Sequence, residues 1–344
     1  MDTSIKRPEG SARFLRQGRK IGRASIFTAA AGSLVLVFLV SVSVGSVRFT
    51  FPQIVSALFS GEASKVRDII VSIRLPRVLM AMLVGANLAV AGAYMQAVMR
   101  NPLADPGIIG VSAGAGLAAV AIMLAFPKLY SLISIAAFAG GCLASALVFL
   151  LSWKNGVEPV RLILSGVAVN ALLGGGISLL SIVYSDRIQG ILQWVNGSLS
   201  AKSMTDFSSL LLFSGAGLVV AALCVPFANA LVLGDDIAKS LGIPVNLARV
   251  FLSAVAAYLT GISISAVGMI GFIGLIIPHI SRLLVGTDYK ALFPLSALLG
   301  ALLLVSADCV ARTAFSPLEI PVGIVMSVLG GPFFVWLLRK RRAM

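Results

Sequence analysis

Long apolar runs separated by short polar stretches occupy most of this chain. A run of about 20 apolar residues forms a helix long enough to cross the hydrocarbon core of a bilayer, which is roughly 30 Å thick. Ten runs are long or apolar enough to predict membrane-spanning helices, at residues 26–46, 78–99, 107–126, 129–152, 160–183, 208–230, 246–266, 268–284, 291–311 and 320–338. The pattern therefore predicts an all-α polytopic membrane protein in which residues 26–338 form a single transmembrane domain.

The eighth run leaves the number of crossings open. Residues 249–286 must hold two crossings in 38 residues, and four glycines offer places to bend: Gly261, Gly268, Gly271 and Gly274. If this stretch formed one long helix instead, the chain would cross nine times. The two termini would then lie on opposite faces of the membrane.

The stretch between the second and third runs is polar and rich in helix breakers. Pro102, Pro106 and Gly107 disfavour one helix that continues through it. Non-helical backbone at membrane depth is tolerated only where protein or a water-filled cavity surrounds it. One interpretation of the stretch is therefore a plain re-entrant turn.

The composition supports the membrane class and narrows the set of partners. Hydrophobic residues make up 58% of the chain and charged residues only 12%, with a mean hydropathy of +1.02. The net charge of +14 could suggest nucleic acid, but the basic residues are split between the two ends and one loop, without interleaved aromatic residues. We interpret them as topology signals and contacts to anionic membrane lipids, and we expect no nucleic-acid partner.

The two ends of the chain are basic. Residues 1–25 and 339–344 are predicted to be cytoplasmic tails, because short basic flanks favour the cytoplasmic side and ten crossings return the chain to the side where it began. The loops between crossings depart from this rule, with an excess of basic residues outside. Much of that excess lies in residues 48–77, which invites a functional explanation.

The chain lacks the residues of an ATPase or a metalloprotein. It contains no Gly-x4-Gly-Lys-Ser/Thr loop, so we expect no enzyme activity, no bound cofactor, and ATP and magnesium only in a partner protein. Cys142, Cys224 and Cys309 are too far apart for a zinc or iron–sulfur motif, and His279 is the only histidine, so we expect no metal site.

One acidic residue inside a predicted span bears on energy coupling. Asp308 lies four residues before Arg312, so the two share a helix face and are expected to form an ion pair. A buried acid can also relay protons. An ion-coupled secondary transporter therefore remains an alternative.

Residues 231–244 between the sixth and seventh runs predict a short helix. Asp235 and Asp236 stand at its start, where acidic groups favour the helix dipole, and Gly242 followed by Pro244 ends it. A capped helix in any cytoplasmic loop would show the same pattern.

Several motifs occur in a fixed order: Arg74-Leu-Pro-Arg77, Gly85-x6-Gly92-x3-Gln96, Asn101-Pro-Leu-Ala-Asp-Pro-Gly107, Gly110-Val-Ser-x-Gly114-x-Gly116, Leu233-Gly-Asp-Asp-x-Ala-x-x-Leu-Gly242, Gly271-Phe-Ile-Gly-Leu-x-Ile-Pro-His279-x-x-Arg282, Ala307-Asp-x-x-Ala-Arg312 and Pro321-Val-Gly-Ile-Val325. Together they closely resemble the FecCD family, the permease subunits of bacterial ABC importers for iron siderophores, haem and cobalamin. The resemblance covers roughly residues 74–338 and implies a fold like that of type II ABC importer permeases.

The resemblance implies a role for both ends of the spans. Arg74, Arg77 and Arg312 correspond to arginines that dock a soluble substrate-binding protein through its acidic residues, although anchoring at lipid headgroups would also explain the first two. A coupling segment that seats in the ATPase corresponds to Leu233, Gly234, Asp235, Asp236, Ala238, Leu241 and Gly242. A bulky residue at Gly234 or Ala238 is then expected to abolish uptake without lowering membrane abundance.

The resemblance also implies a route for the cargo. Asn101 and Leu103 correspond to a cytoplasmic gate, and the fifth span corresponds to the helix that lines the pathway. Gly174, Gly175 and Gly176 lie in that span. Three adjacent glycines also predict an irregular helix, because each weakens a helix by roughly 1 kcal/mol relative to alanine.

The resembling permeases work in an assembly in the bacterial plasma membrane. We therefore expect a second permease, identical or paralogous, together with two cytoplasmic ABC ATPases and an extracytoplasmic substrate-binding protein. Ferric siderophores are the first expectation for the cargo because they are the most frequent cargo of the resembling proteins. Haem and cobalamin are the alternatives, and transport would proceed by alternating access.

Overall fold

The computed structural model describes residues 9–45, 49–59, 65–154 and 156–342, and the elements it contains are helices apart from one isolated bridge between Trp153 and Val157. In chain order they are α1 (Glu9–Ser43), α2 (Phe51–Phe59), α3 (Lys65–Asp68), η1 (Ile69–Arg74), α4 (Leu75–Met99), η2 (Pro106–Ile109), α5 (Val111–Ala125), η3 (Pro127–Leu132), α6 (Ile133–Ser152), α7 (Pro159–Val183), η4 (Ser185–Arg187), α8 (Ile188–Val195), α9 (Met204–Leu223), α10 (Val225–Leu233), α11 (Asp235–Ser240), α12 (Val245–Val267), α13 (Ile273–Val285), α14 (Tyr289–Thr313) and α15 (Val322–Arg342).

The apolar runs of the sequence coincide with helices of this bundle. Among the described residues, seven helices are long and apolar enough to cross a membrane. Shorter apolar helices fill the three remaining runs, at Val111–Ala125, Ile273–Val285 and Val322–Leu337. The prediction of an all-α polytopic membrane protein is therefore confirmed.

Residues 249–286 form two helices rather than one. α12 ends at Val267 and α13 begins at Ile273, with non-helical backbone between them. Gly268 has a φ of +78° there, and an added Cβ would collide with the carbonyl oxygen of Trp194, so this break requires glycine. The single long helix of the nine-crossing alternative is absent from this stretch.

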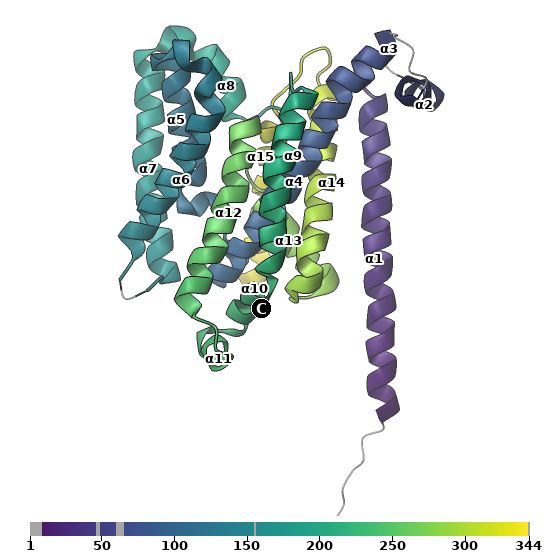
Figure 1. Cartoon of the computed structure of the whole chain (residues 1–344), viewed down its shortest axis with the longest axis vertical. Coiled ribbons are helices and arrows are strands. Elements are labelled where there is room, and N and C mark those ends of the chain that lie inside the picture. The colour runs from purple at the N-terminus through teal and green to yellow at the C-terminus, as the bar shows by residue number, and fades with distance from the viewer. Residues whose placement is uncertain (1–8, 46–48, 60–64, 155, 343–344) are drawn as a thin grey trace, which may run out of the picture.

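The two ends of the bundle differ (Figure 1). One carries α3 and the start of α4, and we call it the α3 end; the other carries α11, and we call it the α11 end. α1 begins and α15 finishes toward the α11 end, as an even number of crossings requires. α5, α6 and α7 lie on one side of the bundle and α1 on the other, with α4 between them.

Several boundaries differ from the predicted ones. The run 208–230 is not one helix: α9 ends within it at Leu223 and α10 begins at Val225. The two helices meet at Cys224, and Pro226 lies in the first turn of α10. The run 107–126 begins with the short η2, so α5 starts only at Val111. α1 begins at Glu9, inside the predicted tail of residues 1–25.

The irregularity predicted at Gly174 to Gly176 is wrong, because α7 runs from Pro159 to Val183 without interruption. Each glycine lowers the stability of the helix. Breaking the helix inside a membrane would leave backbone groups without a hydrogen-bond partner, and this larger cost keeps the helix intact. Gly174 and Gly175 have no atom within 4 Å of the position of an added Cβ, whereas Gly176 faces Leu117 of α5.

Other motif glycines bring helices into close contact. An added Cβ at Gly85 of α4 would collide with the backbone of Gly300 in α14, and one at Gly92 with the backbone of Gly274 in α13. Such small-residue contacts let transmembrane helices approach closely. They fix α4 in the middle of the bundle, from which it positions the polar residues at both ends.

Candidate functional site

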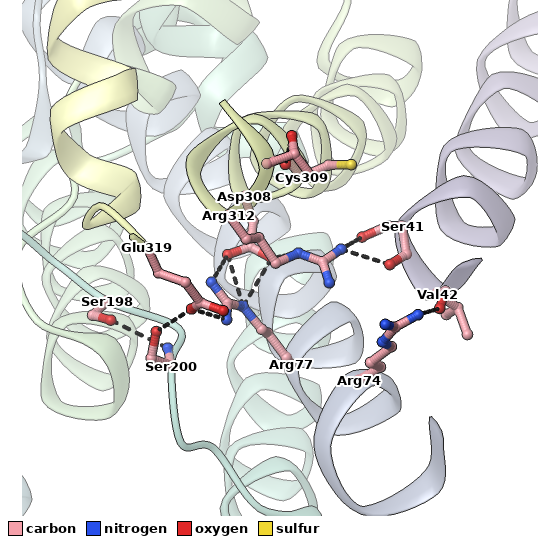
Figure 2. A network of polar contacts seen from close by, with 11 residues as sticks. Ser41, Val42, Arg74, Arg77, Ser198, Ser200, Asp308, Cys309, Arg312 and Glu319 are labelled. Atoms are coloured by element: carbon pink, nitrogen blue, oxygen red, sulfur yellow. Dashed lines mark hydrogen bonds and ion pairs between the residues drawn. The ribbon is translucent and has the colours of Figure 1, made fainter. Parts of the chain in front are cut away.

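An ion-pair network stands at the α3 end, where α1, α4 and α14 meet (Figure 2). Arg77, in the first turn of α4, donates from Nε to both carboxylate oxygens of Asp308, at 3.0 and 3.1 Å. Its Nη1 donates to Oε2 of Glu319 at 2.7 Å. Arg312 approaches Asp308 from one helical turn away, with Nε 3.4 Å from Oδ2, so the ion pair predicted from their spacing is confirmed.

The other two predicted docking positions bind the end of α1. Arg74 donates from Nη1 to the carbonyl oxygens of Val42 and Ser43, at 2.7 and 2.9 Å. Arg312 donates from Nη2 to the carbonyl and hydroxyl oxygens of Ser41. Carbonyls of the last helical turn lack intrahelical donors, so these guanidinium groups satisfy them and tie α1 to α4 and α14.

Burial distinguishes the members of this network, which we call the arginine network (Arg74, Arg77, Asp308, Arg312 and Glu319). The three arginines are only 5–7% exposed and Asp308 is 1% exposed, whereas the side chain of Glu319 is 47% exposed. The predicted docking arginines thus donate to acceptors inside the chain, and Glu319 is the most exposed member of the network. Nothing in the sequence singled out Glu319, which lies outside the matched motifs.

Glu319 also gives the network a dependence on pH. Partial burial raises the pKa of Glu319, but the hydrogen bond and charge of Arg77 outweigh it and hold the pKa below the ordinary value of 4.5. A carboxylate with a lowered folded-state pKa contributes stability above its unfolded pKa and loses it as the pH falls through the folded value.

We therefore predict that the melting temperature of the wild-type chain exceeds that of Glu319→Gln at neutral pH, and that the difference closes as the pH falls below 4.5. The measurement is thermal unfolding of both proteins between pH 7 and pH 3. A difference that stays constant over this range would show that the charge of Glu319 does not contribute.

At the α11 end, Asp235 holds the predicted coupling segment in place. Arg249 of α12 donates from Nη2 to both carboxylate oxygens of Asp235, at 2.9 and 3.0 Å, and from Nη1 to the carbonyl oxygen of Val157 at 2.8 Å. Nη1 of Arg100, at the end of α4, lies 3.6 Å from Asp235. The sequence did not indicate Arg249 or Arg100 as partners of this segment.

The segment presents apolar side chains outward. Leu241 is 61% exposed, and Leu233 and Ile237 are also exposed, whereas Ala238 is fully buried. We call Leu233, Ile237 and Leu241 the α11 patch. A group of exposed apolar side chains beyond the spanning helices, beside the charged Asp235 and Asp236, is typical of a surface that a partner covers.

The structure refines the mutations suited to this segment. Gly234 and Gly242 have φ values of +109° and +77°, which L side chains rarely adopt, and Ala238 has no room to enlarge. Bulky residues at Gly234 or Ala238 would therefore disturb the helix itself. The α11 patch offers cleaner probes because its side chains are exposed.

A cleft of about 710 Å³ lies beside α11. It is lined by Arg100, Lys154, Glu158, Asp235 and Arg249, among others. The cleft therefore brings together the end of α4, the connection between α6 and α7, and the start of α11.

The predicted gate residues form a compact turn directly after α4. Arg100 ends the helix in the left-handed conformation, and Oδ1 of Asn101 accepts a hydrogen bond from the amide of Leu103 at 3.0 Å. The turn is partly buried, and Nδ2 of Asn170 in α7 reaches the carbonyl oxygen of Gly107 at 3.1 Å. Arg100 is thus at once the neighbour of Asn101 and the ion-pair partner of Asp235.

Two of the matched motifs meet in a contact that the sequence did not predict. Gln96 of α4 donates from Nε2 to the carbonyl oxygen of Gly274 at 3.2 Å. Its Oε1 accepts from Nη2 of Arg282 at 2.8 Å. This polar contact attaches both ends of α13 to the last turn of α4.

Residues that commonly bind metals are scattered. Cys142, Cys224 and Cys309 are free thiols, and the ring of His279 lies edge-on to that of Phe333, with centroids 6.0 Å apart. Within the described residues, no group of three or more His, Cys, Asp and Glu side chains is close enough to hold a metal ion.

Comparison with known proteins places this arrangement in a family. The model of the FecCD transport family matches residues 33–340. The chain belongs to the FecCD transport family. By family and by fold it is an ABC-transporter permease, so the membrane-protein class predicted from the sequence and the family resemblance are both confirmed.

Relatives of this FecCD chain include the Fe(3+)-citrate import system permease protein YfmD of Bacillus subtilis, which is 41% identical over 88% of this chain and 90% of its own length. The hemin transport system permease protein HmuU of Yersinia pestis is 42% identical over 79% of this chain and 83% of its own. A solved chain described as an inward-facing, metal-chelate type ABC transporter is 30% identical, with a TM-score of 0.82 over 92% of this chain and 99% of that one.

Proposed function

We propose that this chain is the permease subunit of an ATP-driven importer that moves ferric siderophores across a bacterial plasma membrane. The α11 patch is the observation that carries the proposal, because it offers an exposed docking surface to an ATPase at one end of the bundle. Relatives named for ferric citrate and hemin import support a chelated-iron cargo. Haem and cobalamin are the alternatives, and iron would travel inside its chelator.

We infer that the α11 end faces the cytoplasm, together with both termini. An ABC ATPase with bound ATP and magnesium would cover the α11 patch, with Asp235 and Asp236 at its edge. Movement of α11 would reach the turn at Asn101 and Leu103 through the ion pair between Asp235 and Arg100. The hydrogen bonds from Arg249 to Asp235 would carry the same movement into α12.

At the α3 end we propose that a substrate-binding protein docks above the arginine network. Arg77 is already paired with Asp308 and Glu319, so a carboxylate of the binding protein would reach it by replacing the half-exposed Glu319. Arg74 and Arg312 would support the site by holding α1 and α14 in register. Arginine suits this exchange because its planar fork pairs with carboxylates.

A second permease, identical or paralogous, would complete the pathway against α7. Only Leu162, Gly166 and Val169 of this helix are buried in the single chain, and Leu164, Leu172 and Leu179 are among its exposed residues. Gly174, Gly175 and Gly176 lie on the same helix and would line the route near the gate. In this arrangement, ATP binding and hydrolysis in two ATPases would drive alternating access.

The class of transporter is tested in proteoliposomes that contain the permease, its ATPase and its binding protein. We expect uptake that requires ATP on the ATPase side and that distinguishes ferric siderophore, hemin and cobalamin. Uptake driven by a proton gradient in vesicles without the ATPase would favour the secondary-transporter alternative and overturn the proposal.

The proposed transmission of movement from α11 through Arg100 to the turn at Asn101 is tested by Arg100→Gln. Because the ion pair between Arg100 and Asp235 is long and partly exposed, its loss is worth about 0.2–1 kcal/mol. We expect uptake to fall by about 1.4–5-fold while the amount of permease in the membrane stays constant. The measurement is uptake per assembled transporter, with Lys154→Gln at the same cleft as the control; equal uptake in both variants would contradict the route.

A further inference from the structure

A small cavity with a few polar side chains in its lining lies in the middle of the transmembrane bundle, apart from the arginine network and the α11 patch. Its volume is about 130 Å³, and its lining includes Leu88 from the middle of α4 and Thr260 of α12. The chain turns back into the bundle after α4, so that Asp105 and Pro106 also reach this depth, where Pro106 packs beside Gly274 at the start of α13.

Among the residues that the structure describes, Asp105 is the only charged one that lines the cavity. The amide of Gly107 donates to its Oδ1 at 2.8 Å. Within the ranges that the structure describes, no arginine or lysine forms an ion pair with it. A carboxylate at this depth needs a compensating positive charge, because a single backbone hydrogen bond does not replace the hydration it has lost.

Thr260 supplies the second, independent observation. Its side chain is 1% exposed and lines the cavity, and Oγ1 has no hydrogen-bond partner among the described residues. A threonine hydroxyl in a helix commonly bonds the carbonyl four residues earlier, as Ser263 does one turn further along. The Thr260 oxygen is therefore available to a ligand, and Ser112 lines the same cavity.

The break between α12 and α13 completes the wall. Met269, Ile270 and Gly271 belong to this non-helical break and line the cavity, and a Cβ added at Gly271 would meet no atom within 4 Å. Interrupted transmembrane helices provide the backbone carbonyls that hold small cations in other transporters. The cavity thus combines one carboxylate, hydroxyl groups and interrupted backbone.

We propose that this cavity binds one alkali metal cation, Na⁺ or K⁺. The single carboxylate of Asp105 balances one positive charge, whereas calcium sites usually gather several carboxylates. All of the polar side chains are oxygen donors, which suit a hard cation and not a transition metal. The volume leaves room for water beside the ion. A bound cation would hold the turn after α4 against the break between α12 and α13.

The test uses the purified full chain in lipid nanodiscs and follows its melting temperature as NaCl or KCl replaces N-methyl-D-glucamine chloride at constant ionic strength. We expect a saturable rise with at least one of the two salts, since a ligand of the folded state stabilises it in proportion to its occupancy. Equilibrium binding of radioactive ²²Na⁺, with KCl as competitor, should give one site per chain. A melting temperature that depends on pH but not on either cation would mean that Asp105 is neutralised by a proton, and would overturn the proposal.

Two variants and a control locate the site. Asp105→Asn should abolish the response to the cation, and Thr260→Val should weaken the apparent affinity about tenfold through the loss of one oxygen ligand. The matched control is Thr313→Val in α14, whose hydroxyl bonds Cys309 outside the cavity, and it should respond like the wild type. An undiminished response in Asp105→Asn would overturn the proposal. If that variant does not fold, unchanged affinity in Thr260→Val would overturn it instead.

Discussion

Replacing Asp308 with asparagine is expected to destabilise the chain by about 3–5 kcal/mol, the usual effect of removing one partner from a buried ion pair. Asp308 is 1% exposed and receives Arg77 and Arg312 on the same carboxylate. Asparagine is nearly the same size, so the loss would come from two buried guanidinium groups left without their counter-charge. The measurement is unfolding of the purified protein, together with its abundance in membranes.

Glu319→Gln is the matched control for this prediction, because it also removes one negative charge that pairs with Arg77. Its side chain is about half exposed, so solvent screens the pair and the loss should stay below about 1 kcal/mol. If Asp308→Asn were no more destabilising than Glu319→Gln, the arginine network would not be a buried unit that holds α1, α4 and α14 together.

The sequence predicted the spans well because each span must be apolar along its own length. That property is local, so a single run reveals it. The ion pair of Asp308 with Arg312 was equally predictable from four-residue spacing on one helix. The bond from Arg77 to Asp308 joins residues 231 positions apart, and no local pattern encodes such a contact. The same reasoning applies to Arg249, which reaches Asp235 only because α11 folds back on α12.

Two features show where local rules fail in a membrane bundle. Propensity predicted that Gly174 to Gly176 would interrupt the helix, but α7 stays regular because backbone groups in lipid have no better partner than each other. The polar turn after α4 was recognised from its prolines. Its return into the bundle, which puts Asp105 level with Leu88, depends on how α5, α12 and α13 pack and could not be inferred from the turn alone.

An aspartate in place of Leu241 is expected to abolish uptake while leaving the permease at its normal abundance. Leu241 is 61% exposed in the single chain, so the folded state loses little packing. Under the proposed function the side chain is buried in the ATPase, and its loss costs about 1.5–3 kcal/mol of burial, with a further cost for desolvating the new carboxylate. Affinity for the ATPase should therefore fall at least ~100-fold. The measurements are co-purification of the ATPase and uptake in proteoliposomes.

Ser240→Asp separates the loss of apolar contact from the added charge. Ser240 is exposed on the same short helix and lies next to Leu241, so this variant adds the same charge without removing an apolar side chain. We expect it to retain most of the ATPase binding, and Ile237→Asp to behave like Leu241→Asp because both side chains belong to the α11 patch. If Leu241→Asp and Ile237→Asp bound the ATPase normally, the ATPase would have to dock elsewhere at this end of the bundle. If all three variants lost binding equally, charge near Asp235 and Asp236, and not the apolar patch, would govern docking.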